Sequence, residues 1–195
     1  MKKIFLLIFC FLIISYNNLY AQNIQRIDSI PTTLEGFIEL RDELAVSSQG
    51  GALLFMIAMM MYIEDIELGR KAFVISLDRS VLVFGDDYKG YSPPDYFDFH
   101  LKHLSEKPWI AKSYILNTLP EKNYLLPEKI KYRIKKEYYN TLIDGEFRVF
   151  IDCSGSIWER EMKVIKNNRG IWKVLDFRDI FVDVIPPTPL ADDGF

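Results

Sequence analysis

The chain has 195 residues, of which 24 are Lys or Arg and 27 are Asp or Glu, so its formal net charge at neutral pH is -3. The contents of 49% hydrophobic and 26% charged residues are ordinary for a globular protein and exclude a disordered, collagen-like or disulfide-dense chain. Because the charge balance lacks the strong basicity of nucleic-acid-binding domains, we expect no nucleic-acid partner.

The first 21 residues predict a secretory signal peptide. The positive start Met1–Lys3 precedes the apolar run Ile4–Ile14, and Ala21 is the small residue after which we expect cleavage. This run is shorter than the ~20 residues that cross a bilayer, so we expect a periplasmic or secreted protein without a stable membrane span. Loss of the leader leaves 22 basic residues, a net charge of -5 and one cysteine, Cys153, which excludes an internal disulfide.

Helical periodicity dominates the first half of the remaining chain. Thr32–Glu35 fits a capping box, and apolar residues then recur at helical spacing, so we predict a helix over 33–46. We expect further helices over 71–79 and from Pro94, a favourable first helical residue, to just before Pro108. The stretch 84–94, rich in Gly, Asp and Pro, predicts a loop.

The segment Ala52–Ile63 is uniformly apolar and contains four methionines. A Met-rich run of this kind is typical either of an adaptable or membrane-inserting binding surface or of a helix buried on all sides. Since 12 residues are too few to span a bilayer, we predict a buried helix at the centre of the fold.

The second half of the chain shows strand patterning. Apolar and polar residues alternate from residue 129 and again over 147–153, and turn formers in Asn167–Gly170 separate two further apolar stretches. We also expect strands over 109–116 and 181–184. Helices first and strands second predict an α+β fold, with a helical N-terminal half packed on a C-terminal antiparallel sheet. We assign residues 1–21 to the signal, 31–187 to one α+β domain and 188–195 to a flexible tail.

Five segments together resemble an uncharacterised family of exported bacterial proteins, of the kind found in Bacteroidota. These segments are Leu34–Ala45, Gly50–Ala52, Leu77–Ser80, Tyr88–Tyr91 and Asn168–Val174. The resemblance implies a domain of unknown function and supplies no activity, substrate or catalytic residue. Gly170–Val174 is also similar to the last strand of the cone-shaped family typified by nuclear transport factor 2.

The two histidines, His100 and His103, are spaced to share a helix face, where Asp95 and Glu106 would add oxygen ligands for a divalent cation. The other interpretation is a solvated helix face. Cys153 would need a histidine nearby to act as a nucleophile, and its position in an apolar alternation favours a core residue instead.

A basic strand face of Lys131, Arg133 and Lys135 is a candidate binding site for a polyanion or an acidic glycan. Trp109 is a further candidate binding residue, because a tryptophan ring can stack on a sugar. The same pattern is typical of the wet face of an antiparallel sheet, and tryptophan is often a core residue.

The sequence contains no catalytic constellation, phosphate loop or cofactor motif, so we expect no cofactor. We predict a non-catalytic exported domain that binds a periplasmic or extracellular ligand or protein. The alternative is a small-molecule-binding or hydrolytic pocket in a curved sheet, capped by the Met-rich helix. A protein whose partner is a second copy of itself is a third hypothesis.

Overall fold

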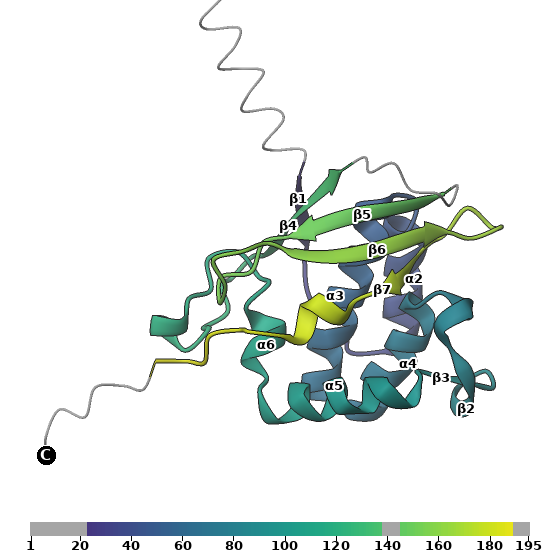
Figure 1. Ribbon diagram of the computed structural model, residues 1–195, viewed down its shortest axis with the longest axis horizontal. Coiled ribbons are helices and arrows are strands. Elements are labelled where there is room, and N and C mark those ends of the chain that lie inside the picture. The colour runs from purple at the N-terminus through teal and green to yellow at the C-terminus, as the bar shows by residue number, and fades with distance from the viewer. Residues whose placement is uncertain (1–22, 138–144, 189–195) are drawn as a thin grey trace, which may run out of the picture.

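The computed structural model describes residues 23–137 and 145–188, which form a layer of helices beneath an antiparallel sheet (Figure 1). The helices are α2 (Leu34–Leu44), α3 (Ser48–Glu64), α4 (Ile66–Ser76), α5 (Asp95–Glu106) and α6 (Trp109–Lys112), with short 3₁₀ turns η1 (Arg79–Val81), η2 (Pro120–Lys122) and η3 (Arg178–Phe181). The strands are β1 (Ile24–Ile27), β2 (Val83–Tyr88), β3 (Tyr91–Ser92), β4 (Ile130–Glu137), β5 (Glu146–Ile151), β6 (Arg160–Lys166) and β7 (Trp172–Asp176). The predicted α+β class is confirmed, while the predicted signal peptide and residues 189–195 of the predicted tail lie outside the described residues.

The main sheet has the order β1-β4-β5-β6-β7, and each neighbouring pair is antiparallel. The predicted turn between its last two strands is confirmed. There the side-chain oxygen of Asn167 accepts hydrogen bonds from the backbone amides of Arg169 (2.9 Å) and Ile171 (3.0 Å). Gly170 adopts a φ of 78°, a left-handed conformation that glycine tolerates without strain. Asn167 thus fixes the turn that joins β6 and β7.

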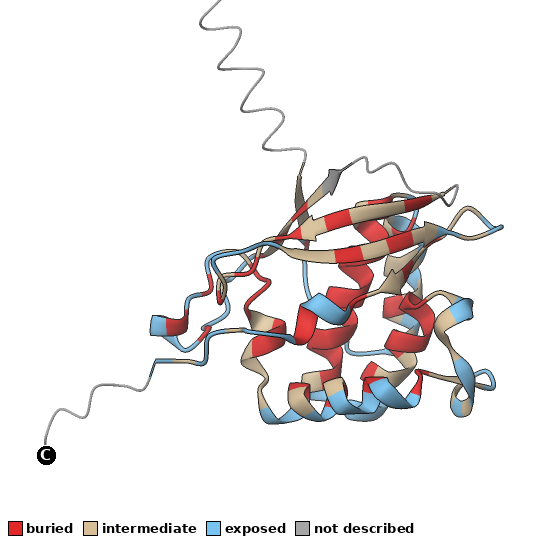
Figure 2. Ribbon diagram, in the orientation of Figure 1, coloured by how far each residue is buried: buried red, intermediate tan, exposed pale blue. Residues whose placement is uncertain are grey.

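Helix α3 is the centre of the fold and confirms the prediction of a helix buried on all sides. It begins with Ser47, whose side chain accepts a hydrogen bond from the amide of Gly50, and its residues 50–62 are all buried (Figure 2). It contacts α2, α4, α5 and α6 as well as all four strands β4–β7. Methionine packs into irregular gaps, which explains how four of them fit a helix with neighbours on every side. Within residues 23–137 and 145–188, no helix combines the length and apolar character needed to cross a membrane.

Two predicted elements differ in the structure. Residues 83–92 form the hairpin β2–β3 rather than an open loop, because Lys89 and Gly90 adopt left-handed φ values of 49° and 82° in a two-residue turn. Residues 109–116 begin with the short helix α6 instead of a strand. The buried pairs Ile110–Ala111 and Tyr114–Ile115 recur every four residues, as in a helix that packs on one face.

Two further details of the prediction were wrong. Residues 181–184 do not close the sheet: the chain turns through η3, and Ile180 and Phe181 are buried there. The first predicted helix is capped by Thr33, whose hydroxyl accepts a hydrogen bond from the amide of Gly36 at 3.1 Å, so the capping box that starts at Thr32 does not form.

Candidate functional site

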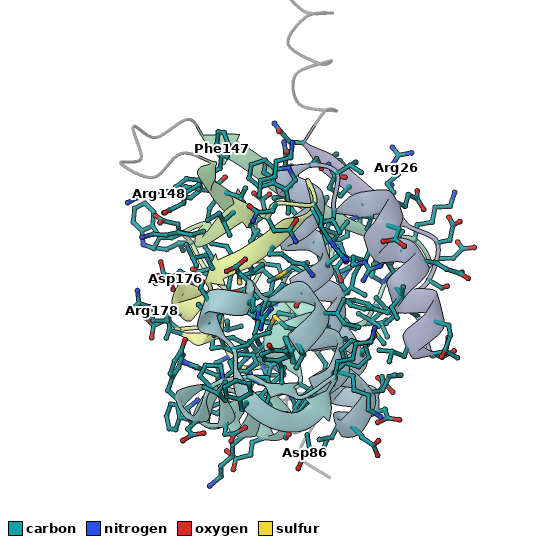
Figure 3. All side chains as sticks on the ribbon, turned by 90° about the vertical axis from the view of Figure 1, so that its right-hand side faces the viewer. Arg26, Asp86, Phe147, Arg148, Asp176 and Arg178 are labelled. Carbon is teal, nitrogen blue, oxygen red and sulfur yellow. The ribbon has the colours of Figure 1, made fainter. Side chains whose placement is uncertain are left out.

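A cleft of about 660 Å³ opens at the β7 edge of the sheet. The chain leaves α4 along this edge, where Leu77 forms a parallel bridge with Val174 and the amide of Asp78 donates to the carbonyl of Val174 at 2.8 Å. The hairpin β2–β3 and the β6–β7 turn project on either side, at the right of Figure 1, and Figure 3 views the molecule from there. We call this cavity the basic cleft, because six cations line it: Arg41, Arg79, Lys89, Lys166, Arg169 and Lys173.

The hairpin side of the cleft carries two cations that lie on aromatic rings. The Arg79 guanidinium lies 5.0 Å from the centre of the Tyr91 ring, and the Lys89 ammonium lies 5.2 Å from the centre of the Tyr88 ring. Asp78 caps η1 by accepting a hydrogen bond from the amide of Ser80 at 2.9 Å. Local backbone geometry therefore presents both cations at defined positions.

The opposite side is the β6–β7 turn, which presents Lys166 and Arg169. Both residues are exposed, and the Asn167 cap holds the backbone between them. The floor of the cleft is apolar and includes Val74, Ile75 and Leu82. Cations at the rim above an apolar floor favour a ligand whose charged groups face outward from a less polar body.

Lys173 lies at the inner end of the cleft. Its ammonium donates a hydrogen bond to the carbonyl of Ile75 in the last turn of α4. Burial and, to a smaller extent, repulsion from Arg41 lower the pKa of Lys173 to about 8, while Asp78 and Asp42 act in the opposite direction. Arg41 itself binds the neighbouring Asp42 carboxylate, with Nε and Nη2 at 2.9 and 2.6 Å from Oδ1.

The positive charge of the cleft is largely uncompensated. In the described part of the chain, no carboxylate lies within 4.0 Å of the charged nitrogens of its four exposed cations, Arg79, Lys89, Lys166 and Arg169. Asp78 is the one carboxylate among the described lining residues, and Ser80 already occupies one of its oxygens. Such an arrangement attracts anions.

The lining residues offer binding groups rather than a reactive centre. They include no His, Cys, Ser, Thr or Glu among the residues that the structure describes at the cleft. The ionisable groups of this lining are its six cations, Asp78 and the tyrosines Tyr88 and Tyr91. The arrangement supports recognition of an anion.

The predicted basic strand face lies elsewhere, on β4. Arg133 Nη1 contacts Asp152 at 2.6 Å, Lys135 forms an ion pair with Glu159, and Lys131 lies opposite Arg26 of β1. Partners from the loop between β5 and β6 thus compensate part of this face.

Ion pairs also occur on the neighbouring strands β5, β6 and β7 and on η3. Arg148 lies 3.3 Å from Glu161, Arg178 binds Asp176 at 2.5 Å, and Figure 3 shows Arg148, Asp176 and Arg178 on one side of the molecule. The cations on this part of the sheet surface are thus paired with carboxylates, whereas, among the described residues, the exposed cations of the basic cleft are not.

Trp109 opens α6 in the helical layer and packs against the core. Cys153 is buried, with its sulfur 3.3 Å from the Ser113 hydroxyl.

The two histidines lie on α5, as predicted. His100 stacks on Phe181 with ring centres 4.8 Å apart, and burial lowers its pKa, with a smaller contribution from His103. The ring of His103 lies 4.4 Å from that of Phe99. Across the described ranges, no three His, Cys, Asp or Glu residues are grouped to hold a metal ion.

A family model described as Domain of unknown function (DUF6935) matches residues 29–188. The chain belongs to this family. Membership in DUF6935 confirms the resemblance to an uncharacterised domain. No curated protein and no solved structure matches the chain, so the Bacteroidota source and the similarity to nuclear transport factor 2 stay predictions.

The segments that carry the resemblance to the family converge on the basic cleft. Four of the five contribute lining residues: Arg41, Leu77–Arg79, Tyr88–Lys89 with Tyr91, and Asn168–Arg169 with Lys173. In the sequence these segments spread over more than 130 positions, so nothing in their spacing reveals that they meet. The one local signal is a cation placed in a tight turn, as in Tyr88–Tyr91 and Asn167–Gly170.

Proposed function

We propose that this protein is an exported, non-catalytic binding domain whose basic cleft holds a small, multiply charged anion. The observation that carries the proposal is the convergence of six cations on one cleft of a chain whose net charge is -3. The predicted signal peptide supports export, and cations placed above an apolar floor support binding of an anion.

The distribution of the cations favours a ligand with several negative charges. They come from separate walls of the cleft: α2, η1, the β2–β3 hairpin and the β6–β7 strands. A single anionic group contacts one wall, whereas a multiply charged anion reaches several at once. The apolar floor keeps water away from part of the ligand, which strengthens each ionic contact. A volume of about 660 Å³ lies within the range of small-molecule sites.

Titration calorimetry tests this proposal. The probes are inorganic tripolyphosphate and naphthalenetrisulfonate, added to the protein produced from the full-length chain. We expect both to bind at neutral pH, more weakly as salt is raised, because screening reduces attraction between exposed charges. The double variant Lys89→Gln/Lys166→Gln should bind roughly tenfold more weakly, since it removes two charges that face the ligand.

The matched control replaces two exposed lysines on α5 and η2, Lys102→Gln/Lys122→Gln, which changes the net charge equally outside the cleft. Its affinity for both probes should stay close to that of the unmodified protein. Equal weakening by the two double variants would show that net charge, not the cleft, attracts anions. Failure of both probes to bind at low salt would overturn the proposal.

A further inference from the structure

We propose that capture of an anion in the basic cleft is coupled to proton uptake by Lys173, so that the cleft releases its ligand as the solution becomes alkaline. This inference rests on the proposed function, since it describes the regulation of the same site.

The position of Lys173 makes its charge sensitive to what occupies the cleft. The residue lies on the edge strand β7 between Trp172 and Val174, which are both buried, while its own side chain lines the cleft. The hydrogen bond to the carbonyl of Ile75 holds the ammonium near the end of α4. Because Lys173 is only partly exposed, neighbouring charges act on it with less screening than on a lysine in bulk water.

Cations predominate among the groups that surround Lys173. Arg41 and Asp42 approach from α2, and Asp78 approaches from the end of α4. The other cations that line the cleft are Arg79 on η1, Lys89 on the hairpin, and Lys166 and Arg169 at the β6–β7 turn. Burial and Arg41 hold the pKa of Lys173 at about 8, so about half of the molecules carry a neutral amine at that pH.

A bound anion reverses this balance. Negative charge beside the amine favours its protonated form, so the pKa of Lys173 is higher in the complex than in the free protein. Between those two pKa values, binding takes up a proton. By linkage, the affinity for the anion must fall with rising pH over the same range.

Calorimetry with naphthalenetrisulfonate measures the coupling, because the three sulfonates of this probe stay ionised throughout. Titrations near pH 7 and pH 9, each in two buffers of different ionisation enthalpy, give the affinity and the number of protons taken up. We expect binding to be roughly three- to tenfold weaker near pH 9 than near pH 7, with uptake of roughly 0.2 to 0.8 proton per ligand near pH 9.

Two arginine variants assign the proton. Lys173→Arg keeps a permanent charge, so its affinity should change much less between the two pH values and its proton uptake should vanish. Lys166→Arg makes the same replacement at an exposed position in the same cleft and should retain the pH dependence. A third variant, Arg41→Gln, removes the repulsion and should move the fall in affinity to higher pH, which tests the coupling even if Lys173→Arg does not fold.

The possible results separate this inference from the proposed function. Binding with equal affinity at both pH values and without proton uptake would overturn the coupling while the anion site stands. Persistence of the pH dependence in Lys173→Arg would also overturn it. Absence of binding at either pH would overturn the proposed function itself.

Discussion

Lys173 occupies a position that folding alone does not favour. An ammonium group held out of water near Arg41 costs folding free energy, which an apolar side chain of similar length would avoid. Residues that break a local rule of stability in this way are typical of functional sites. The same cost makes the free energy of unfolding depend on pH, and this dependence can be measured without any ligand.

The low pKa of Lys173 predicts that the stability of the folded protein rises with pH. Because the pKa of Lys173 is about 8 in the folded protein and 10.5 ordinarily, the unfolded chain binds more protons between these values, so the free energy of unfolding increases with pH there. We expect the stability of the unmodified protein relative to Lys173→Met to increase by about 1 kcal/mol between pH 7.5 and 9.5. Urea denaturation at both pH values measures this difference. A constant difference, or the same increase relative to Lys166→Met, would contradict the prediction.

At the scale of elements, the β2–β3 hairpin depends on one arginine of α4. Arg70 contacts Asp87 of the hairpin through Nε and Nη2, at 2.7 and 2.9 Å, and Asp98 of α5 through Nη1 at 2.7 Å. Burial alone would raise the pKa of Asp87, but hydrogen bonds from Arg70 and Ser92 hold it below its usual value. Arg70 therefore orients the hairpin that carries Tyr88, Lys89 and Tyr91 into the cleft.

Arg70→Gln should weaken naphthalenetrisulfonate binding several-fold, although Arg70 does not line the cleft. The same substitution should lower the free energy of unfolding by about 2 kcal/mol. The control is Lys71→Gln, which removes an adjacent cation paired with the exposed Glu67 and should change both quantities little. Combining Arg70→Gln with Asp87→Asn should add little to the loss of affinity, because both break the same contact. Additive losses would argue against this positioning role.

The elements that the sequence predicts well are those with a strong local pattern. The run Ala52–Ile63 is uniformly apolar and too short to span a bilayer, which favours a buried helix, and Asn167–Gly170 contains the residues that a tight turn requires. Residues 109–116 were misassigned because a short apolar run fits either a strand or one turn of helix until its packing partners are known. The hairpin at 83–92 was missed because its Gly and Asp residues are typical of loops as well as of turns.

The candidate site is less predictable for a different reason. A sequence shows where cations are but not whether carboxylates will reach them. Arg133 and Lys135 look like an unpaired basic face, and Asp152 and Glu159 approach them only after β4, β5 and the following loop come together. The cations of the cleft likewise come together only through contacts between distant segments, such as the Leu77–Val174 bridge.

For the whole molecule, charge is distributed unevenly over an acidic chain. Six cations gather at one cleft of a chain whose net charge is -3, so carboxylates are in excess over cations in the rest of the chain. The proposed cleft can bind only anions that are present in the same compartment, so the cellular location of the protein limits the choice of ligand.

Export provides a direct prediction at this scale. When the full-length chain is expressed in a bacterium, we expect the protein outside the cytoplasm to begin at Gln22, because Ala21 supplies the small residue that signal cleavage requires. Intact-mass measurement of the periplasmic fraction and the medium identifies the terminus. Ala21→Tyr should block this cleavage and leave the longer precursor. Accumulation of the uncut chain in the cytoplasm would contradict the prediction.

Strand β1 has a consequence for the order of assembly. It pairs with Ile130–Arg133, more than one hundred residues further along the chain. A polypeptide that emerges amino end first therefore exposes β1 long before its partner exists, whereas β5, β6 and β7 form local hairpins as soon as they appear. Because contacts between distant segments close slowly, the flank of β4 stays open until late. That interval is when neighbouring chains are most able to associate through an unprotected strand.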